Sequence, residues 1–77
     1  MNTSEKLVYM ANQIAANFAR LGEPAAVIAT ADHIARFWDP GMRSKIARRL
    51  DEPENGLSDA AAAAIRTLRT GQEISSQ

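Results

Sequence analysis

The chain has 77 residues, with nine Lys or Arg, nine Asp or Glu, one His and no Cys. This length corresponds to one small domain, and the balanced charge excludes a general electrostatic attraction to nucleic acid or to anionic membranes. The lack of Cys excludes disulfides, thiolate metal sites and iron–sulfur ligation.

The apolar content is modest for a self-sufficient core. Hydrophobic residues make up 45% of the chain, but 15 of these 35 residues are Ala, which leaves 20 larger side chains. Burial contributes about 25 cal/mol per Å² against about 1.5 kcal/mol of entropy for each ordered residue, so such a domain is only marginally stable. We therefore expect the chain to depend on a partner.

No stretch of the sequence resembles a membrane or export segment. No apolar run approaches the roughly 20 residues of a membrane span. The first six residues lack the basic region and following apolar stretch of a signal peptide. We expect a cytoplasmic protein without membrane contact.

The first predicted helix covers residues 5–21, with Ser4 as its N-cap and Gly22 as its end. Apolar residues recur along it at steps of three and four, which predicts one buried face. This face comprises Leu7, Met10, Ala11, Ile14, Phe18 and Leu21, and Val8 and Ala15 widen it. The amides of Asn12 and Asn17 lie on a solvated face or contact a partner.

The second predicted helix begins at Glu23-Pro24 and ends at Trp38, and the short Gly22 connection folds it back antiparallel on the first. Its expected buried face comprises Val27, Ile28, Ala31, Ile34, Ala35 and Trp38. A second stripe, formed by Ala26, Thr30, His33 and Phe37, lies more than about 90° away. Phe37 is then either covered by the third helix or exposed as a partner contact.

The third predicted helix starts at Asp39-Pro40, where Asp is a favoured N-cap and Pro suits the first helical position. It runs to about Leu50, and its apolar side carries Met42, Ile46 and Leu50. Its four cations are Arg43, Lys45, Arg48 and Arg49, and the acidic loop at residues 51–56 follows. The simplest interpretation is a solvated face of ion pairs.

The fourth predicted helix has Ser58 as its N-cap and Leu57 as a hydrophobic staple. Ala61, Ile65 and Leu68 form a narrow stripe for close packing, and Gly71 is expected to end the helix. The sequence thus predicts an all-α fold, a small bundle of three to four short helices that begins with an antiparallel hairpin. Residues 1–71 form a single domain, and residues 72–77 form a disordered tail.

The sequence offers no catalytic or metal site. Asp32 and His33 are neighbours that point about 100° apart on a helix, so they do not form a catalytic dyad. A single His without Cys is a poor metal ligand set, and no glycine-rich phosphate loop follows a strand. We expect no enzymatic activity from the chain alone.

Two stretches together resemble one protein family. The first is KLVYMANQIA at residues 6–15, with Phe18; the second joins ADHI at residues 31–34, FWDP at residues 37–40 and Met42-Arg43. These motifs are similar to the delta subunit of soluble, NAD-dependent, molybdenum-containing formate dehydrogenases over most of residues 5–50. The chain departs from the family at Gly41, where Arg is common and would add a charged contact.

The resemblance implies a small, non-catalytic subunit of a bacterial complex that supports assembly, stability or cofactor maturation of the catalytic alpha subunit. In such complexes the alpha subunit oxidises formate at a bis-molybdopterin guanine dinucleotide centre. Electrons then pass through iron–sulfur clusters to FMN and NAD in other subunits. The resemblance implies no catalytic, metal-binding or cofactor-binding residue in this chain.

The resulting hypothesis is a hetero-oligomer in which this chain docks on the alpha subunit. The candidate partner-binding residues are His33, Phe37, Arg36, Arg43, Asn12 and Asn17, and the structural residues are Trp38, Asp39 and Pro40. Two alternatives stay open. One is a helix-turn-helix DNA-binding protein, against which the zero net charge and the acidic loop argue. The other is a helical protein that associates with its own copy.

Overall fold

A computed structural model describes residues 2–75, with side chains to residue 71. The chain forms α1 (Thr3–Phe18), the 3-10 turn η1 (Ala19–Leu21), α2 (Ala25–Phe37), α3 (Pro40–Arg49) and α4 (Asp59–Ser75). The described residues form no strand. The predicted all-α fold is confirmed.

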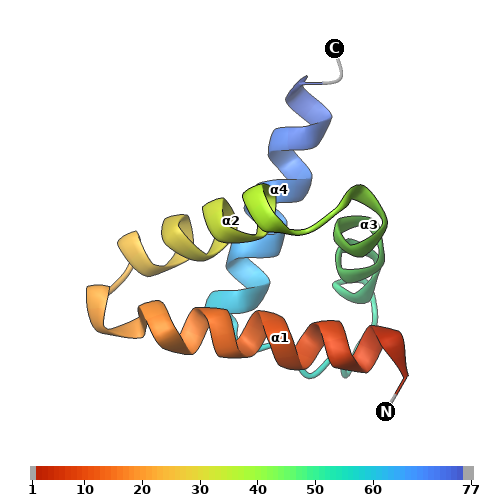
Figure 1. Cartoon of the computed structure of the whole chain (residues 1–77), viewed down its shortest axis with the longest axis horizontal. Coiled ribbons are helices and arrows are strands. Elements are labelled where there is room, and N and C mark those ends of the chain that lie inside the picture. Colours follow the sequence, from red (N-terminus) through yellow and green to blue (C-terminus); the bar gives the residue numbers. More distant parts are fainter. Residues whose placement is uncertain (1, 76–77) are drawn as a thin grey trace.

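The helices are arranged as a hairpin with two further helices against it (Figure 1). α1 and α2 lie side by side and antiparallel, and α3 lies across the end of this pair. α4 crosses behind the hairpin, packs against the other three helices, and extends beyond them at its far end (Figure 1).

Helix α1 starts earlier than its sequence predicts. Its N-cap is Asn2, whose side chain accepts a hydrogen bond from the Glu5 backbone at 2.8 Å. The Glu5 carboxylate accepts in return from the Asn2 backbone at 3.0 Å, which completes a capping box. The prediction of Ser4 was wrong because the Glu that completes the box stands three residues after Asn2. Gly22, at φ 73°, follows η1 and ends this segment as predicted.

The boundary between α2 and α3 lies where the sequence places it. Trp38 follows α2 in an extended conformation, with φ −94° and ψ 136°. The Asp39 carboxylate then accepts a hydrogen bond from the Met42 backbone at 2.9 Å, and Pro40 is the first residue of α3. The three predicted structural residues therefore form the turn between the two helices, and the Asp39 carboxylate satisfies one of the free backbone amides at the start of α3.

The core is built around a few large side chains. Trp38 is only 5% exposed and packs in one cluster with Leu7, Ile34, Ile46 and Ile65. Alanines of α4 complete this cluster from behind the hairpin, because their small side chains allow close approach of the helices. The predicted central position of Trp38 and the apolar side of α3 are confirmed.

The buried faces of α1 and α2 are rotated from those that the periodicity predicts. On α1 the buried residues are Leu7, Val8, Ala11 and Ala15, while Met10 and Leu21 are exposed. On α2, Ala26 and Thr30 are buried, whereas Ile28 is 62% exposed and Ala35 is also exposed. The rotation arises because α4 packs against both helices, which a prediction from two helices alone does not include.

Helix α4 begins where the sequence predicts but ends later than predicted. Its start agrees, since the Ser58 hydroxyl accepts a hydrogen bond from the Ala61 backbone at 3.2 Å. Its end does not, because the helix continues through Gly71 to Ser75. Gly71 does not adopt the positive φ of a glycine that ends a helix, so the helix can continue through it. Residues 76 and 77 of the predicted tail lie outside the described residues.

None of the described helices has both the length and the apolar character needed to span a membrane.

Candidate partner-binding surface

The second stripe of α2 divides into a buried half and an exposed half. Ala26 and Thr30 are buried, and the Thr30 hydroxyl donates to the Ala26 carbonyl at 2.7 Å, so its polar group is satisfied. Further along the same stripe, His33 is half-buried and Phe37 is 70% exposed. The third helix does not cover Phe37, so the interpretation in which that helix buries the ring is wrong.

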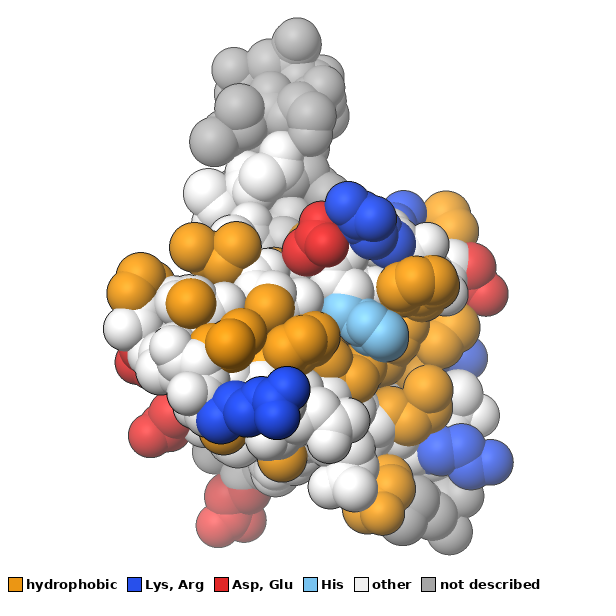
Figure 2. Space-filling view, turned by 60° about the vertical axis from the view of Figure 1, so that its left-hand side comes forward, with side chains coloured by type: hydrophobic (Ala, Val, Ile, Leu, Met, Phe, Trp, Pro, Cys, Tyr) orange, Lys and Arg blue, Asp and Glu red, His pale blue; other side chains and the backbone are white. Residues whose placement is uncertain are grey.

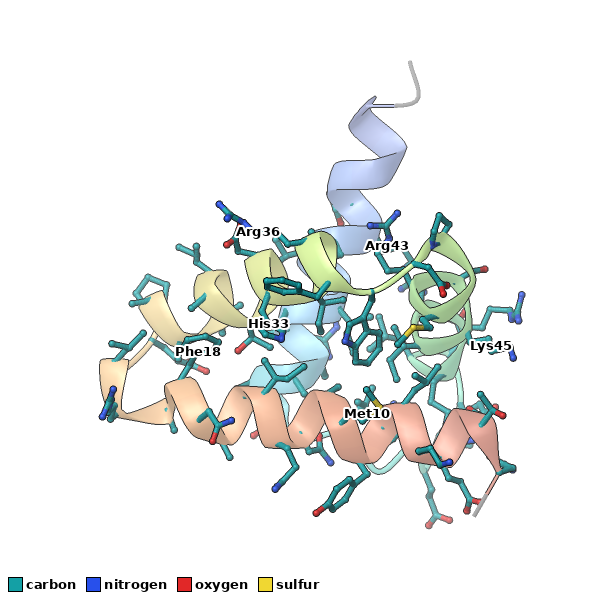
Figure 3. The ribbon with its side chains drawn as sticks, in the orientation of Figure 1. Met10, Phe18, His33, Arg36, Arg43 and Lys45 are labelled. Carbon is teal, nitrogen blue, oxygen red and sulfur yellow. The ribbon has the colours of Figure 1, made fainter. Side chains whose placement is uncertain are left out.

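Three rings meet across the hairpin and form what we call the aromatic ridge: Phe18, His33 and Phe37. The His33 and Phe37 ring centroids are 4.7 Å apart and tilted by 46°. The Phe18 and His33 centroids are 6.4 Å apart in an edge-on arrangement. His33 thus bridges α1 and α2 (Figure 3). The apolar periodicity of α1 places Phe18 in the core, so the sequence does not predict its part in this surface.

Further apolar side chains continue the ridge over the hairpin. Apolar atoms lie on both sides of the His33 ring in the space-filling view (Figure 2). Met10, which is 36% exposed, lies further along α1 towards α3 (Figure 3). An exposed phenyl ring on a wider apolar surface is typical of the anchors that dominate protein interfaces.

Arg36 lies beside the ridge and points away from α1 (Figure 3). Its Nε is 3.0 Å from the Asp32 carboxylate one turn earlier, and both side chains are largely exposed. An exposed pair of this kind contributes about 0.3–0.5 kcal/mol to stability. Arg36 is therefore available at the edge of the ridge without being needed for the fold.

The other candidate residues lie apart from the ridge or have roles within the chain. Arg43 donates to the Ala35 carbonyl at 2.9 Å, which holds α3 against the end of α2. Asn12 donates to the Gly56 carbonyl and accepts from the Ser58 backbone, both at 2.9 Å. Asn17 is exposed. The structure brings His33 and Phe37 into ring contact and places Arg36 next to Phe37 on α2. It gives Arg43 and Asn12 contacts that a sequence pattern does not reveal.

The predicted ion-pair face of α3 forms only in part. Arg49 pairs with Glu52 at 3.2 Å. Asp51 instead pairs with Arg69 of α4 at 3.1 Å. Within the described residues, the side chains of Lys45 and Arg48 have no hydrogen-bond or ion-pair partner.

Side chains that could bind a metal ion together are lacking in the part of the chain that the structure describes. The described residues contain no group of three or more His, Cys, Asp or Glu side chains that could hold a metal ion. The single His packs between two phenyl rings, and the sequence contains no Cys for an iron–sulfur cluster.

Comparison with protein families identifies the chain. The family model described as NADH-dependent formate dehydrogenase delta subunit, FdsD, matches residues 6–65. The chain belongs to the FdsD family. The matched range contains the whole aromatic ridge and the boundary between α2 and α3, so the predicted resemblance is confirmed. As a formate dehydrogenase delta subunit, the chain has the other subunits of that complex as partners. Comparisons with curated proteins and with solved structures gave no match.

Proposed function

We propose that this FdsD-family chain is a non-catalytic delta subunit that supports assembly, stability or molybdenum-cofactor maturation of the catalytic alpha subunit. It docks on that subunit through the aromatic ridge. The observation that carries this proposal is the contrast between adjacent residues, since Trp38 is 5% exposed and Phe37 is 70% exposed. Trp38 is the aromatic side chain that packs in the core. The neighbouring ring of Phe37 is exposed and therefore available to contact a partner.

The chemistry of the ridge suits a buried contact better than exposure to water. A phenyl ring on an interface buries roughly 150–250 Å² and is worth more when its neighbours are also aromatic. The His33 ring packs against one side of the Phe37 ring, with the two centroids 4.7 Å apart. Because this contact already restricts the Phe37 side chain, Phe37 loses little rotamer freedom when it binds a partner. Arg36 at the edge supplies the polar rim that surrounds such anchors.

The absence of ligand sets in this chain's sequence supports the non-catalytic role. The resemblance assigns the molybdenum centre, the iron–sulfur clusters and FMN to other subunits, and this chain offers no Cys and one ring-packed His. No step of formate oxidation is therefore assigned to residues of this chain. The chain contributes a surface, the aromatic ridge, that binds the alpha subunit.

The test is the affinity of the chain for the purified alpha subunit, measured for Phe37→Ala. Loss of an interface anchor raises Kd by about 30-fold or more, which corresponds to about 2 kcal/mol. Tyr9→Ala is the matched control, because Tyr9 is 57% exposed on the face of α1 that points away from the core. This control is expected to bind as the unmodified chain does. Equal affinity of both variants would contradict docking through the ridge.

Arg43 is also a candidate partner-binding residue, but Arg43→Glu is not a clean test of docking. This substitution also removes the hydrogen bond to the Ala35 carbonyl, so weaker binding could reflect a displaced α3. Arg36→Glu avoids the problem, because the one polar partner of Arg36 among the described residues is Asp32, at the surface of the same helix. Sedimentation of the isolated chain over a concentration series tests the remaining alternative, in which the ridge pairs with a second copy.

A further inference from the structure

One edge of the molecule collects positive charge. We call it the basic edge and define it by Arg43, Lys45, Arg48 and Arg49 of α3 with Arg69 of α4. These five cations line two open hollows of about 370 and 380 Å³, together with only two carboxylates, those of Asp51 and Glu52. The remaining sequence carries seven acidic and four basic residues, so a chain of zero net charge is strongly polarised.

Both carboxylates at the basic edge are already neutralised. Asp51 lies 3.1 Å from Arg69, and Glu52 lies 3.2 Å from Arg49. The surplus charge therefore belongs to the other three cations, and Arg43 is engaged with the backbone of α2. Lys45 and Arg48 keep their donors free within the described part of the chain. Arg48 lines both hollows, so it stands between them.

The basic edge is separate from the aromatic ridge. Lys45 points outward from α3, away from the hairpin, whereas Phe18 and His33 lie in the space between α1 and α2 (Figure 3). The two surfaces also differ in chemistry, since one offers apolar rings and the other offers charged donors. A partner that contacts both must carry an apolar pocket and, at some distance from it, an acidic region.

We propose that the basic edge binds an acidic segment of the same subunit on which the ridge docks, with carboxylate side chains seated in the hollows on either side of Arg48. This proposal rests on the proposed function for the identity of the partner. Guanidinium groups bind carboxylates through paired, charge-assisted hydrogen bonds, and Ser44 adds a hydroxyl to one hollow. The rest of the chain carries net negative charge and would repel an acidic segment of the partner. The partner's acidic segment therefore favours the basic edge, and this preference sets the orientation of docking.

The test is the association kinetics of the full chain with the purified partner subunit at low and high salt. Charges at the rim of an interface act chiefly on the association rate and on its salt dependence. Arg48→Glu is therefore expected to lower kon by about tenfold at low salt, with a smaller rise in koff and a flatter salt dependence. Lys45→Glu is expected to act in the same direction. Circular dichroism of each variant checks that the total helix content is unchanged.

Arg66→Glu is the matched control, because Arg66 is an exposed cation of α4 and the substitution changes the net charge equally. If this control slows association as much as Arg48→Glu does, net charge alone explains the effect and the proposal is overturned. An unchanged kon and salt dependence for Arg48→Glu would also overturn it. The proposal gains support only from a loss specific to the basic edge.

The same measurement separates this proposal from docking through the ridge. Phe37→Ala is expected to raise koff with little effect on kon, since the ring acts after the two proteins meet. A normal koff for Phe37→Ala together with a slowed Arg48→Glu would reject the ridge and retain the basic edge. A titration with duplex DNA completes the design. Tight, salt-sensitive DNA binding that Arg48→Glu abolishes would assign the basic edge to nucleic acid and overturn the proposal.

Discussion

The side chain of Asn12 in α1 accepts a hydrogen bond from the backbone N–H of Ser58 at 2.9 Å, across 46 residues of sequence. The same amide donates to the Gly56 carbonyl, also at 2.9 Å. Gly56 lies close to Val8 as well, because a Cβ built on this glycine would stand 3.4 Å from Val8 Cγ1. One amide therefore fixes the loop that precedes α4 and places Ser58 where it caps the helix.

Asn12→Ala is expected to lower the free energy of unfolding by about 1–3 kcal/mol, because two backbone groups lose their partners. Asn12→Asp keeps the acceptor for Ser58 but places a carboxylate opposite the Gly56 carbonyl, so it is also expected to destabilise. Gln13→Ala is the control, since Gln13 is exposed and its substitution should change stability by less than about 0.5 kcal/mol. Urea unfolding measures all three. Equal midpoints for Asn12→Ala and Gln13→Ala would contradict this account of the loop.

Asp39→Ala tests the junction between α2 and α3. It removes the carboxylate that accepts from the Met42 backbone at 2.9 Å, at a cost of about 1 kcal/mol. In a domain of this size such a loss lowers Tm by roughly 4–8 °C. Asp39→Asn should leave Tm nearly unchanged, because Asn is an equally good N-cap. A Tm that falls equally in both variants would mean that the carboxylate acts through its charge and not as a cap.

Trp38→Ala and Phe37→Ala are neighbouring substitutions with opposite expected outcomes. Truncation of the buried Trp38 costs about 3–5 kcal/mol, which is most of the stability of a domain of this size. Truncation of Phe37, which is 70% exposed, should change the free energy of unfolding by no more than about 1 kcal/mol. Thermal unfolding followed by circular dichroism compares the two. A large loss for Phe37→Ala would show that the ring stabilises the isolated chain and would weaken its use as a binding probe.

The parts of the fold that the sequence predicts are those with local causes. The boundary at Trp38, Asp39 and Pro40 follows from cap chemistry and from the fixed φ of proline, and both act within a few residues. The Ser58 cap has a local cause of the same kind, since its hydroxyl accepts from the Ala61 backbone three residues later, and the distant contact with Asn12 supports it. These predictions hold because the tertiary contacts in the structure agree with the local preferences.

Two features that the sequence does not predict depend on where α4 lies. The buried face of α1 turns towards Val8 and Ala15 because α4 and its loop cover that side. The role of Asn12 needs the same loop, which is distant in sequence. For the ridge, the periodicity separates Phe37 from the core but places Phe18 within it. The ring contact of Phe18 with His33 depends on how the hairpin closes, and no sequence spacing encodes that.

Gly71→Ala distinguishes the observed end of α4 from the one expected from sequence. In the structure α4 runs through this position to Ser75, and a Cβ at Gly71 would meet no described heavy atom within 4 Å beyond its chain neighbours and the adjacent helix backbone. Ala in a helix is more favourable than Gly by up to about 1 kcal/mol, so the substitution should raise both helix content and Tm. If Gly71 instead ended the helix in a left-handed conformation, Ala would cost roughly 1–2 kcal/mol and Tm would fall. Gly22→Ala is the reference for that second case, because Gly22 has a φ of 73° and its substitution should destabilise the chain. The sign of the Tm change at Gly71, compared with that at Gly22, therefore decides where α4 ends.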